Sequence, residues 1–375
     1  MQANLPARRS IVLSLALIAA GVATAAYQLP RQGALAAEAE QRNRLAQAAR
    51  MQVVANGQYM IESIAVDARG TLYISAMNEH RVYAMNDAGQ RIEFTDRNAP
   101  EHETFRPERL LYPTALAADA TGNLYVADRS MDTGGCVLGP RIKKIGPGGA
   151  LTRLAHADAA LDHHTAGLLV TAIAVDSEGV LYVQEWGDTF KLSSTGKRTL
   201  LAVPDSVDAA GEPAPNGGLA AHPEGGVIVA NSRHGLYRVF PDGRAVTLET
   251  HGGDCALASP RAPVPPDFSV CGPTPDSACV KRVEAAQPVP CIINAVAVDA
   301  HGRIFLSDNS RILRVDTDGA MSTVFDPGDT EPMPLKNPRQ QHGPATMALS
   351  PRGDIYWARE AKLYKITPWS RLLPL

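Results

Sequence analysis

One short phrase that recurs along the chain constrains its fold more than any other feature. Within residues 291–325 this phrase consists of four runs of apolar or alternating residues, separated by tight turns such as Asp299-Ala300-His301-Gly302. Runs of this length between Asp/Gly turns are typical of β-strands. The phrase therefore predicts four antiparallel strands. A unit this small cannot bury its own faces, so we expect it to stack on copies of itself.

Further copies of the phrase are spread over most of the sequence. They lie at residues 64–76, 115–128, 173–185, 219–231 and 347–359, and each is followed by a third apolar run. The copies align on the residue that begins the first turn, here called the anchor: Asp67, Asp119, Asp176, His222, Asp299 and Ser350. Six units at roughly the period of a propeller blade predict an all-β, six-bladed β-propeller. A β-helix needs a shorter period, and a sandwich would not repeat one phrase in this way.

The N-terminal segment predicts export. Residues 1–26 contain Arg8-Arg9, an apolar run and Ala23-Thr24-Ala25, in the order of a signal peptide. A cleaved signal peptide and a retained inner-membrane anchor both fit this pattern. Either one places the remaining chain outside the cytoplasm, in the periplasm or secreted, with membrane contact only through this segment. Residues 27–55, rich in helix formers, are expected to form a short spacer helix, and residues 56–375 to form the propeller.

Charge and cysteine content indicate which partners and which cross-links to expect. The net charge of −3 and the scattered Lys and Arg residues argue against a nucleic-acid partner. Four cysteines lie in or beside a Pro-rich insertion at residues 250–291, between the fourth and fifth units: Cys255, Cys271, Cys279 and Cys291. In an oxidising compartment two disulfides are expected there, with their pairing left open. A zinc site is the alternative, although no C-x-x-C pair is present; Cys136 is left over.

Loop lengths differ sharply between the two faces of the predicted ring. All turns between first and second strands and the recognisable turns between third and fourth strands are short, which defines a trimmed face. The long connections lie on the opposite, elaborated face: 95–112, 129–140, 155–170, 202–216, 250–291 and 326–344. Because function concentrates on elaborated loops held by a rigid scaffold, we expect this face to bind a small molecule, a glycan or a protein.

The first strand of each unit, here called the inner strand, should line the central channel and start on the elaborated face. The residue five positions before each anchor then lies at the channel mouth. These mouth residues are Glu62, Thr114, Thr171, Gly217, Asn294 and Ala345, and a bulge could bring Asn216 into the same ring. Glu62, Asn216, Asn294, Thr114 and Thr171 offer an all-oxygen set that suits Ca²⁺ or another divalent cation. The alternative is that they bond to one another and to channel water.

Candidate catalytic groups lie near the same face. His163 and His164, in the loop before the third unit, could act as general bases, or belong to a solvated polar loop. Glu185, beside Trp186 at the end of a second strand, is the third candidate. Asp128 occupies the corresponding position in the second unit, where a carboxylate is commonly satisfied by backbone N–H groups.

The repeated phrase ALAADATGNLYVAD, followed by RIKKI, resembles the NHL repeat. Residues 214–243 resemble a blade of the senescence-marker-protein/gluconolactonase family, within the superfamily that includes strictosidine synthase-like proteins. The resemblance spans about residues 60–370. It implies a divalent metal at the channel mouth, held by a glutamate of the first blade and asparagines of later blades, with an aspartate that also serves in catalysis.

Residue by residue, this resemblance is incomplete. Glu62 matches the glutamate and Asn216 matches an asparagine, whereas Thr114 stands where another asparagine is usual. Asn294 stands where the catalytic aspartate is expected, and an amide cannot take up a proton. Ala345 replaces the glutamate of strictosidine synthase-type proteins.

Two function classes follow from this pattern. The first is an exported binding or scaffold propeller, which is favoured because each enzyme template lacks a residue it needs. The alternative is a divalent-metal-assisted lactone or ester hydrolase in which His163, His164 or Glu185 replaces the missing aspartate as the base.

Overall fold

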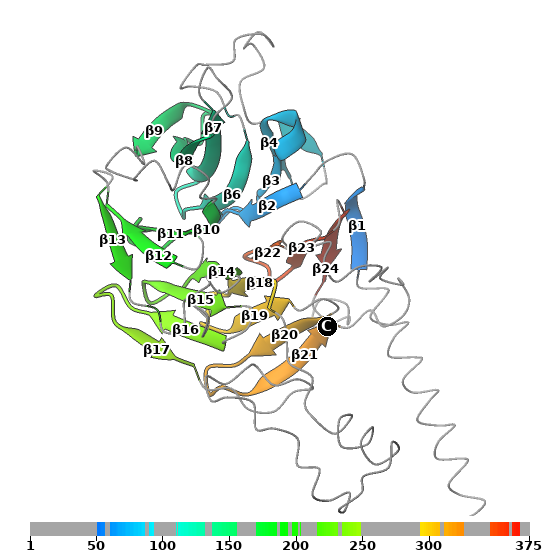
Figure 1. Cartoon of the computed structure of the whole chain (residues 1–375). Coiled ribbons are helices and arrows are strands. Elements are labelled where there is room, and N and C mark those ends of the chain that lie inside the picture. The colour runs from blue at the N-terminus through cyan, green and yellow to red at the C-terminus, as the bar shows by residue number, and fades with distance from the viewer. Residues whose placement is uncertain are drawn as a thin grey trace, which may run out of the picture. The chain divides into compact units, whose positions relative to one another are not determined.

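The computed structural model arranges the chain as six four-stranded sheets around a central axis (Figure 1). All strand pairs are antiparallel, and the inner strands of successive blades are neighbours around the ring. The predicted all-β, six-bladed β-propeller is therefore confirmed. The structure describes residues 51–56, 61–86, 90–93, 110, 112–131, 137–155, 170–185, 188–193, 197–201, 203, 216–231, 235–248, 293–307, 311–325, 346–359 and 362–367.

The first five blades each use four consecutive strands, counted outwards from the axis. Blade 1 is β2 (Ile61–Val66), β3 (Leu72–Ala76), β4 (Arg81–Met85) and β5 (Arg91–Glu93), with the 3-10 helix η1 (Met77–Glu79) after β3. Blade 2 is β6 (Pro113–Ala118), β7 (Leu124–Met131), β8 (Val137–Ile145) and β9 (Leu151–Ala155). Blade 3 is β10 (Val170–Val175), β11 (Leu181–Glu185), β12 (Asp188–Leu192) and β13 (Arg198–Leu201). Blade 4 is β14 (Asn216–Ala221), β15 (Val227–Asn231), β16 (Gly235–Val239) and β17 (Ala245–Thr247). Blade 5 is β18 (Ala295–Val298), β19 (Ile304–Ser307), β20 (Ile312–Val315) and β21 (Met321–Phe325).

Blade 6 closes the ring with a strand from the opposite end of the propeller. Its first three strands are β22 (Thr346–Leu349), β23 (Ile355–Arg359) and β24 (Lys362–Ile366), and the outermost is β1 (Met51–Asn56). β1 pairs antiparallel with β24, so that Met51 lies opposite Ile366.

The start of the propeller therefore differs from the sequence-based boundary. The sequence predicts a spacer helix up to residue 55, but residues 51–56 form a strand because the pair Val53-Val54 favours an extended backbone and β24 offers a free edge. The propeller begins at Met51. The expected signal segment, the remainder of the spacer and the insertion 250–291 lie outside the described residues. Within the described ranges, no helix has the length and hydropathy needed to cross a bilayer.

Packing between blades follows one rule at all six interfaces. Two residues before each anchor the inner strand carries a buried alanine: Ala65, Ala117, Ala174, Ala220, Ala297 and Ala348. In each interface this alanine shares a hydrophobic cluster with a larger apolar residue from the inner strand of the following blade, as Ala65 does with Leu116 and Ala348 with Ile64. Small residues facing large ones suit the space near the axis, where the blades converge.

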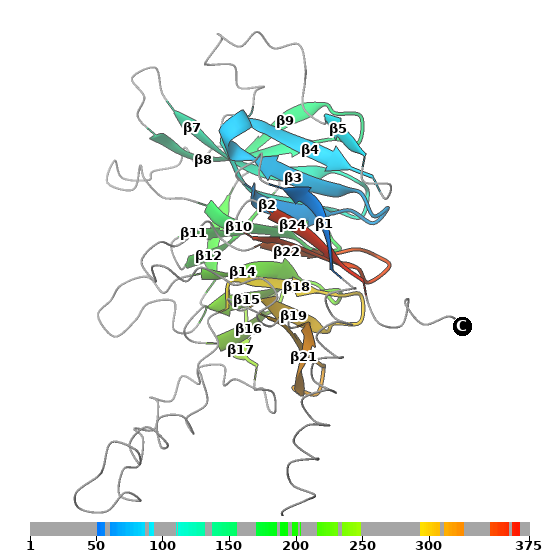
Figure 2. The same ribbon diagram turned by 90° about the vertical axis from the view of Figure 1, so that its right-hand side faces the viewer.

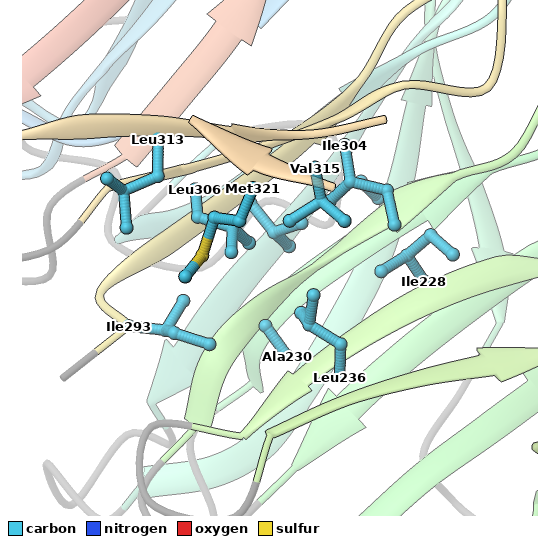
Figure 3. Packing of buried hydrophobic residues seen from close by; sticks show 11 residues of the cluster. Ile228, Ala230, Leu236, Ile293, Ile304, Leu306, Leu313, Val315 and Met321 are labelled. Carbon is cyan, nitrogen blue, oxygen red and sulfur yellow. The ribbon is translucent and has the colours of Figure 1, made fainter. Parts of the chain in front are cut away.

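The interface between blades 4 and 5 illustrates this core (Figure 3). Ile228, Ala230 and Leu236 of blade 4 face Ile304 and Leu306 of blade 5 within one buried cluster. This cluster contains no aromatic residue, whereas the cluster between blades 5 and 6 includes Phe305, Phe325 and Trp357. Neighbouring blades thus bury their apolar faces against each other.

The anchors fix the turns of the trimmed face. Asp67 Oδ1 accepts the backbone N–H groups of Arg69 and Thr71 at 2.9 and 2.8 Å, and its Oδ2 accepts the hydroxyl of Tyr73 at 3.2 Å. Asp119 and Asp176 repeat all three contacts in blades 2 and 3. Asp side chains that accept local N–H groups stabilise tight turns.

One predicted loop on the elaborated face is instead largely strand. Residues 129–140 were expected to form a loop, but β7 and β8 extend into this stretch and pair as far as Met131 and Val137. This hairpin reaches beyond the neighbouring strands (Figure 2). The sequence does not indicate this extension. The strand pairing continues past an irregularity between Arg129 and Met131, which interrupts the regular alternation of a strand.

Candidate functional site

The predicted mouth residues lie at β-bulges in the inner strands. Pairing between the first two strands of a blade shifts at Glu62-Ser63, Thr114, Thr171 and Gly217. A bulge re-aims side chains and is common at the rims of barrels and beside functional sites. The same irregularity therefore recurs in four blades, at the positions selected from the sequence by their spacing from the anchor.

Asn294 occupies the equivalent place in blade 5. Its backbone N–H donates to the Ser307 carbonyl at 2.8 Å, although Ser307 already pairs with Ala295. Asn294 is half-buried. In blade 4, Asn216 begins β14 immediately before the bulge, as expected, but its side chain lies outside the described residues, as does all of Ala345.

Glu62 is the one acidic mouth residue. Its side chain is half-buried, and burial raises the pKa of its carboxyl above the usual value. Among the described residues, none donates a hydrogen bond to Glu62 or offsets this effect with a positive charge. A carboxylate in this state gains from any cation that approaches it, since a nearby opposite charge stabilises the ionised form.

The two mouth threonines use their hydroxyl groups differently from each other. Thr114 is buried, and its Oγ1 lies 3.3 Å from the carbonyl oxygens of both Ala127 and Val170. Thr171 is exposed, and its Oγ1 donates to the Gln184 carbonyl at 3.2 Å. Thr114 therefore ties blade 2 to blade 3, whereas Thr171 keeps oxygen lone pairs on the surface.

Further hydrogen bonds hold the inner strands together near the mouth. The Leu116 N–H donates to Ser63 Oγ at 3.0 Å, which joins blades 1 and 2. The Ile64 N–H donates to Thr346 Oγ1 at 3.3 Å, which joins blades 6 and 1. Together with Thr114, these contacts join the inner strands of blades 6, 1, 2 and 3.

Some of the predicted mouth residues have side chains that could bind a hard cation. Glu62, Thr171 and Asn294 can supply carboxylate, hydroxyl and amide oxygens, the ligand types that Ca²⁺ prefers. Thr114 is already committed to the blade interface. No group of three or more His, Cys, Asp or Glu side chains suited to a metal occurs in the described part of the chain. A cation here would therefore rely on one carboxylate together with neutral oxygens and water.

Glu185, the third candidate base, is held by an ion pair with Arg198. It is buried at the end of β11, and its Oε2 lies 2.5 Å from Arg198 Nη2. It pairs with Val170, which is buried between blades 2 and 3. Burial raises the pKa of Glu185 despite the opposing charge of Arg198. His163 and His164 lie outside the described residues.

Two neighbours of these candidates could not be found from the sequence. Arg198 lies two strands away from Glu185, and Lys143 contacts Asp128 from the adjacent strand. Asp128 also accepts the Tyr112 N–H at 2.8 Å, so its expected bond to the backbone is confirmed. Neither pairing has a local sequence signal, because each depends on strand register.

Comparison with known proteins supports the fold. No protein-family model and no curated protein sequence matches the chain. A gluconolactonase from Xanthomonas campestris is 13% identical, with 85% of this chain and 89% of that chain covered and a TM-score of 0.51. A protein of unknown function from Bacteroides thetaiotaomicron is 15% identical over 84% and 74% of the two chains, with a TM-score of 0.52. A putative gluconolactonase is 14% identical over 85% and 92%, with a TM-score of 0.50. At these identities the likeness shows a shared propeller fold.

Proposed function

We propose that this six-bladed β-propeller binds a divalent cation, with Ca²⁺ as the preferred ion, at the elaborated end of its axis. The bound cation would hold a small oxygen-rich ligand there. The observation that carries the proposal is Glu62, a half-buried carboxylate at a β-bulge whose pKa is raised by burial alone. Thr171 and Asn294 are the described neutral partners around the ring, and Asn216 is the fourth candidate. Backbone and hydroxyl bonds between blades hold this set in place.

Binding without turnover is the better-supported form of this function. A hydrolase needs a group that removes a proton from water, within hydrogen-bond reach of the reacting atom. Asn294 cannot do so, and Glu185 is engaged by Arg198. Of the acidic and imidazole groups predicted for catalysis, the described residues contain Glu185, and its carboxylate is held in this ion pair.

A metal-assisted lactone or ester hydrolase is the second candidate. Its support is the shared fold with a gluconolactonase from Xanthomonas campestris and the match of Glu62 to the glutamate of that family. A bound cation would polarise the ester carbonyl. In this form of the proposal, Glu62 would hold the cation, Asn294 and Thr171 would orient the ester, and His163, His164 or Glu185 would accept the proton from water.

We further propose that the protein acts in the cell envelope or outside the cell. The order of charge, apolar run and small residues in residues 1–26 supports this location. A polar ligand on the looped face would then be met in the periplasm or the medium, where millimolar calcium sites are common among extracellular modules.

Calcium titration of the full-length protein tests the site. Ca²⁺ that binds only the folded state raises the free energy of unfolding by about 2.7 kcal/mol at about 100 times its Kd. We expect a saturable rise in melting temperature that Glu62→Gln abolishes. Glu178→Gln is the matched control, because it removes the same charge from an exposed turn on the trimmed face. Equal calcium shifts in wild type and Glu62→Gln would remove Glu62 from the site.

A hydrolysis assay distinguishes the binding protein from the hydrolase. Glucono-1,5-lactone and a panel of simple lactones and esters, assayed with calcium, should show no hydrolysis above the spontaneous rate if the protein only binds. Calcium-dependent hydrolysis that is lost in Glu62→Gln would instead establish the hydrolase.

A further inference from the structure

Six turns on the trimmed face share one backbone conformation. Each turn joins the first and second strands of a blade, and the N–H three residues after the anchor donates to the anchor carbonyl. Gly70 donates to Asp67 in this way at 3.0 Å, and Gly353 donates to Ser350 at 2.8 Å. The donor is a glycine with a φ between 78° and 87° in all six turns. Equivalent residues of the six turns therefore occupy equivalent places around the axis.

The tips of these turns carry short side chains. The residue directly after each anchor is alanine, serine or proline, and all six are exposed: Ala68, Ala120, Ser177, Pro223, Ala300 and Pro351. Because no long side chain stands at these tips, a second flat surface could approach the turns closely.

The next residue of each turn is also exposed, and in four turns it is charged. These six residues, here called the turn ring, are Arg69, Thr121, Glu178, Glu224, His301 and Arg352. In blades 1 to 5 the backbone N–H of the turn-ring residue donates to the anchor side chain. The same contact thus fixes the place of the turn-ring residue in each of these blades.

Positive and negative charges lie on opposite sides of the turn ring. The inner strands follow one another around the axis, and β22 of blade 6 neighbours β2 of blade 1 (Figure 1). Arg352 and Arg69 are therefore adjacent, and Glu178 and Glu224 of blades 3 and 4 lie across the axis from them. The turns of blades 2 and 5 separate the positive half from the negative half.

Charges further from the axis on this face are mixed in sign. In blade 5, Arg314 Nη2 lies 2.9 Å from Asp316 Oδ2, and in blade 4 Asp242 accepts the N–H of Arg244 within one turn. The separation of charge is therefore a property of the turn ring.

We propose that the trimmed face docks a second copy of this chain, face to face and with two-fold symmetry. A two-fold axis through the turns of blades 2 and 5 exchanges the positive and negative halves. Arg69 of one copy then faces Glu178 of the other, Arg352 faces Glu224, and each contact occurs twice. Two-fold dimers are the commonest protein assemblies and need a patch that complements itself. The surface lies at the opposite end of the axis from Glu62, so this inference goes beyond the proposed cation site.

Salt concentration should control this association. Exposed ion pairs are individually weak and are screened by salt, so we expect a weak dimer at low ionic strength. Sedimentation velocity of the full-length protein over a concentration series measures the dissociation constant. This constant should rise about tenfold or more between about 10 mM salt, where the screening length is about 30 Å, and about 1 M salt, where it is about 3 Å. A wild-type protein that stays monomeric at low salt would overturn the inference.

Charge reversal tests the pairing itself. Arg69→Glu/Arg352→Glu and Glu178→Arg/Glu224→Arg each place like charges opposite one another, so each variant alone should be monomeric. An equimolar mixture of the two variants should dimerise, and the variant with all four changes should dimerise as wild type does. Association that persists in both double variants, or a mixture that stays monomeric, would overturn the proposed pairing.

Two further measurements complete the test. Lys197→Glu/Arg244→Glu reverses two exposed positive charges on the same face outside the turn ring and should weaken the dimer much less than Arg69→Glu/Arg352→Glu. A dimer weakened by the arginine changes but not by the glutamate changes would contradict the two-fold arrangement and indicate an anionic partner instead. The calcium-induced melting shift should be the same in all these variants, so a failure of the dimer and a failure of the cation site are read separately.

Discussion

Lys143 Nζ lies 2.6 Å from Asp128 Oδ2, and the two side chains are only 3% and 0% exposed. This ion pair belongs to blade 2, where Asp128 also accepts the N–H of Tyr112. A buried pair of this kind contributes little net stability, but removing one partner leaves an uncompensated charge in the interior. The pair therefore fixes the start of the inner strand at the elaborated face more than it stabilises the fold.

Breaking this ion pair should destabilise the protein strongly. Lys143→Met leaves Asp128 charged and buried, and we expect the free energy of unfolding to fall by about 3 to 5 kcal/mol. The double variant Lys143→Met/Asp128→Asn removes both charges and keeps an acceptor for the Tyr112 N–H, so it should recover part of the loss. Denaturant unfolding measures both values. A double variant less stable than the single one would contradict this account.

Alanine variants of three glycines should distinguish the cost of backbone strain from the cost of steric overlap. A Cβ at Gly226 would lie 2.2 Å from the Val239 carbonyl oxygen, and its φ is 71°. Gly226→Ala should therefore cost about 2 to 5 kcal/mol. Gly179 shares the positive φ without a close neighbour, so its alanine variant should cost about 1 to 2 kcal/mol.

Gly148 provides the control for this series. It has neither a positive φ nor an atom within 4 Å of its added Cβ, so Gly148→Ala should leave stability unchanged or raise it by about 0.4 to 1 kcal/mol. Thermal unfolding of the three variants should rank them in this order. Equal effects at Gly226 and Gly179 would show that the turn around Gly226 relaxes to accept a Cβ.

His222 should make stability depend on pH. Its Nδ1 accepts the Glu224 N–H at 3.2 Å, and its pKa is lowered by burial and by the charge of Arg238, with Glu224 opposing. The folded state therefore resists protonation more than the unfolded chain. The contribution of neutral His222 is fully present above the unfolded pKa of about 6.5 and is lost as the pH falls towards the lower folded pKa.

An asparagine at position 222 isolates this effect. His222→Asn keeps an oxygen acceptor for the turn but does not titrate. Between about pH 7.5 and about pH 5.5, wild type should lose more unfolding free energy than His222→Asn. Parallel pH profiles for the two proteins would show that protonation of His222 is not coupled to folding.

A second carboxylate should strengthen the proposed cation site. Asn294→Asp adds a negative charge to the ring that contains Glu62 and leaves the N–H bond to Ser307 intact. We expect calcium affinity to rise by about tenfold. Asn86→Asp, in a turn on the trimmed face, adds the same charge at the other end and should change affinity little. A rise of equal size in both variants would indicate a general charge effect rather than a ligand.

The alternation and turn chemistry of this sequence were enough to predict the fold, because each blade repeats the same local signals. Asp67, Asp119 and Asp176 show why: each carries its turn contacts within the four to six residues that follow it. Spacing from the anchors also located Glu62, Thr114 and Thr171, since a strand of fixed rise places equivalent residues at equivalent depth. Bulges at these three positions were not evident from the sequence, whereas the glycine-rich stretch after Asn216 did indicate the bulge of blade 4.

What the sequence determined by itself was the six-fold repeat and the equivalent places of Glu62, Thr114 and Thr171 in their inner strands, both of which depend on residues close together in the chain. Tertiary structure alone decided that Met51–Asn56 completes blade 6, that Arg198 engages Glu185, and that His80 meets Tyr112. These pairs come from different strands or blades, and their meeting depends on register and on the curvature of the ring. No local pattern encodes such contacts, because the partners become neighbours only after the blades have packed.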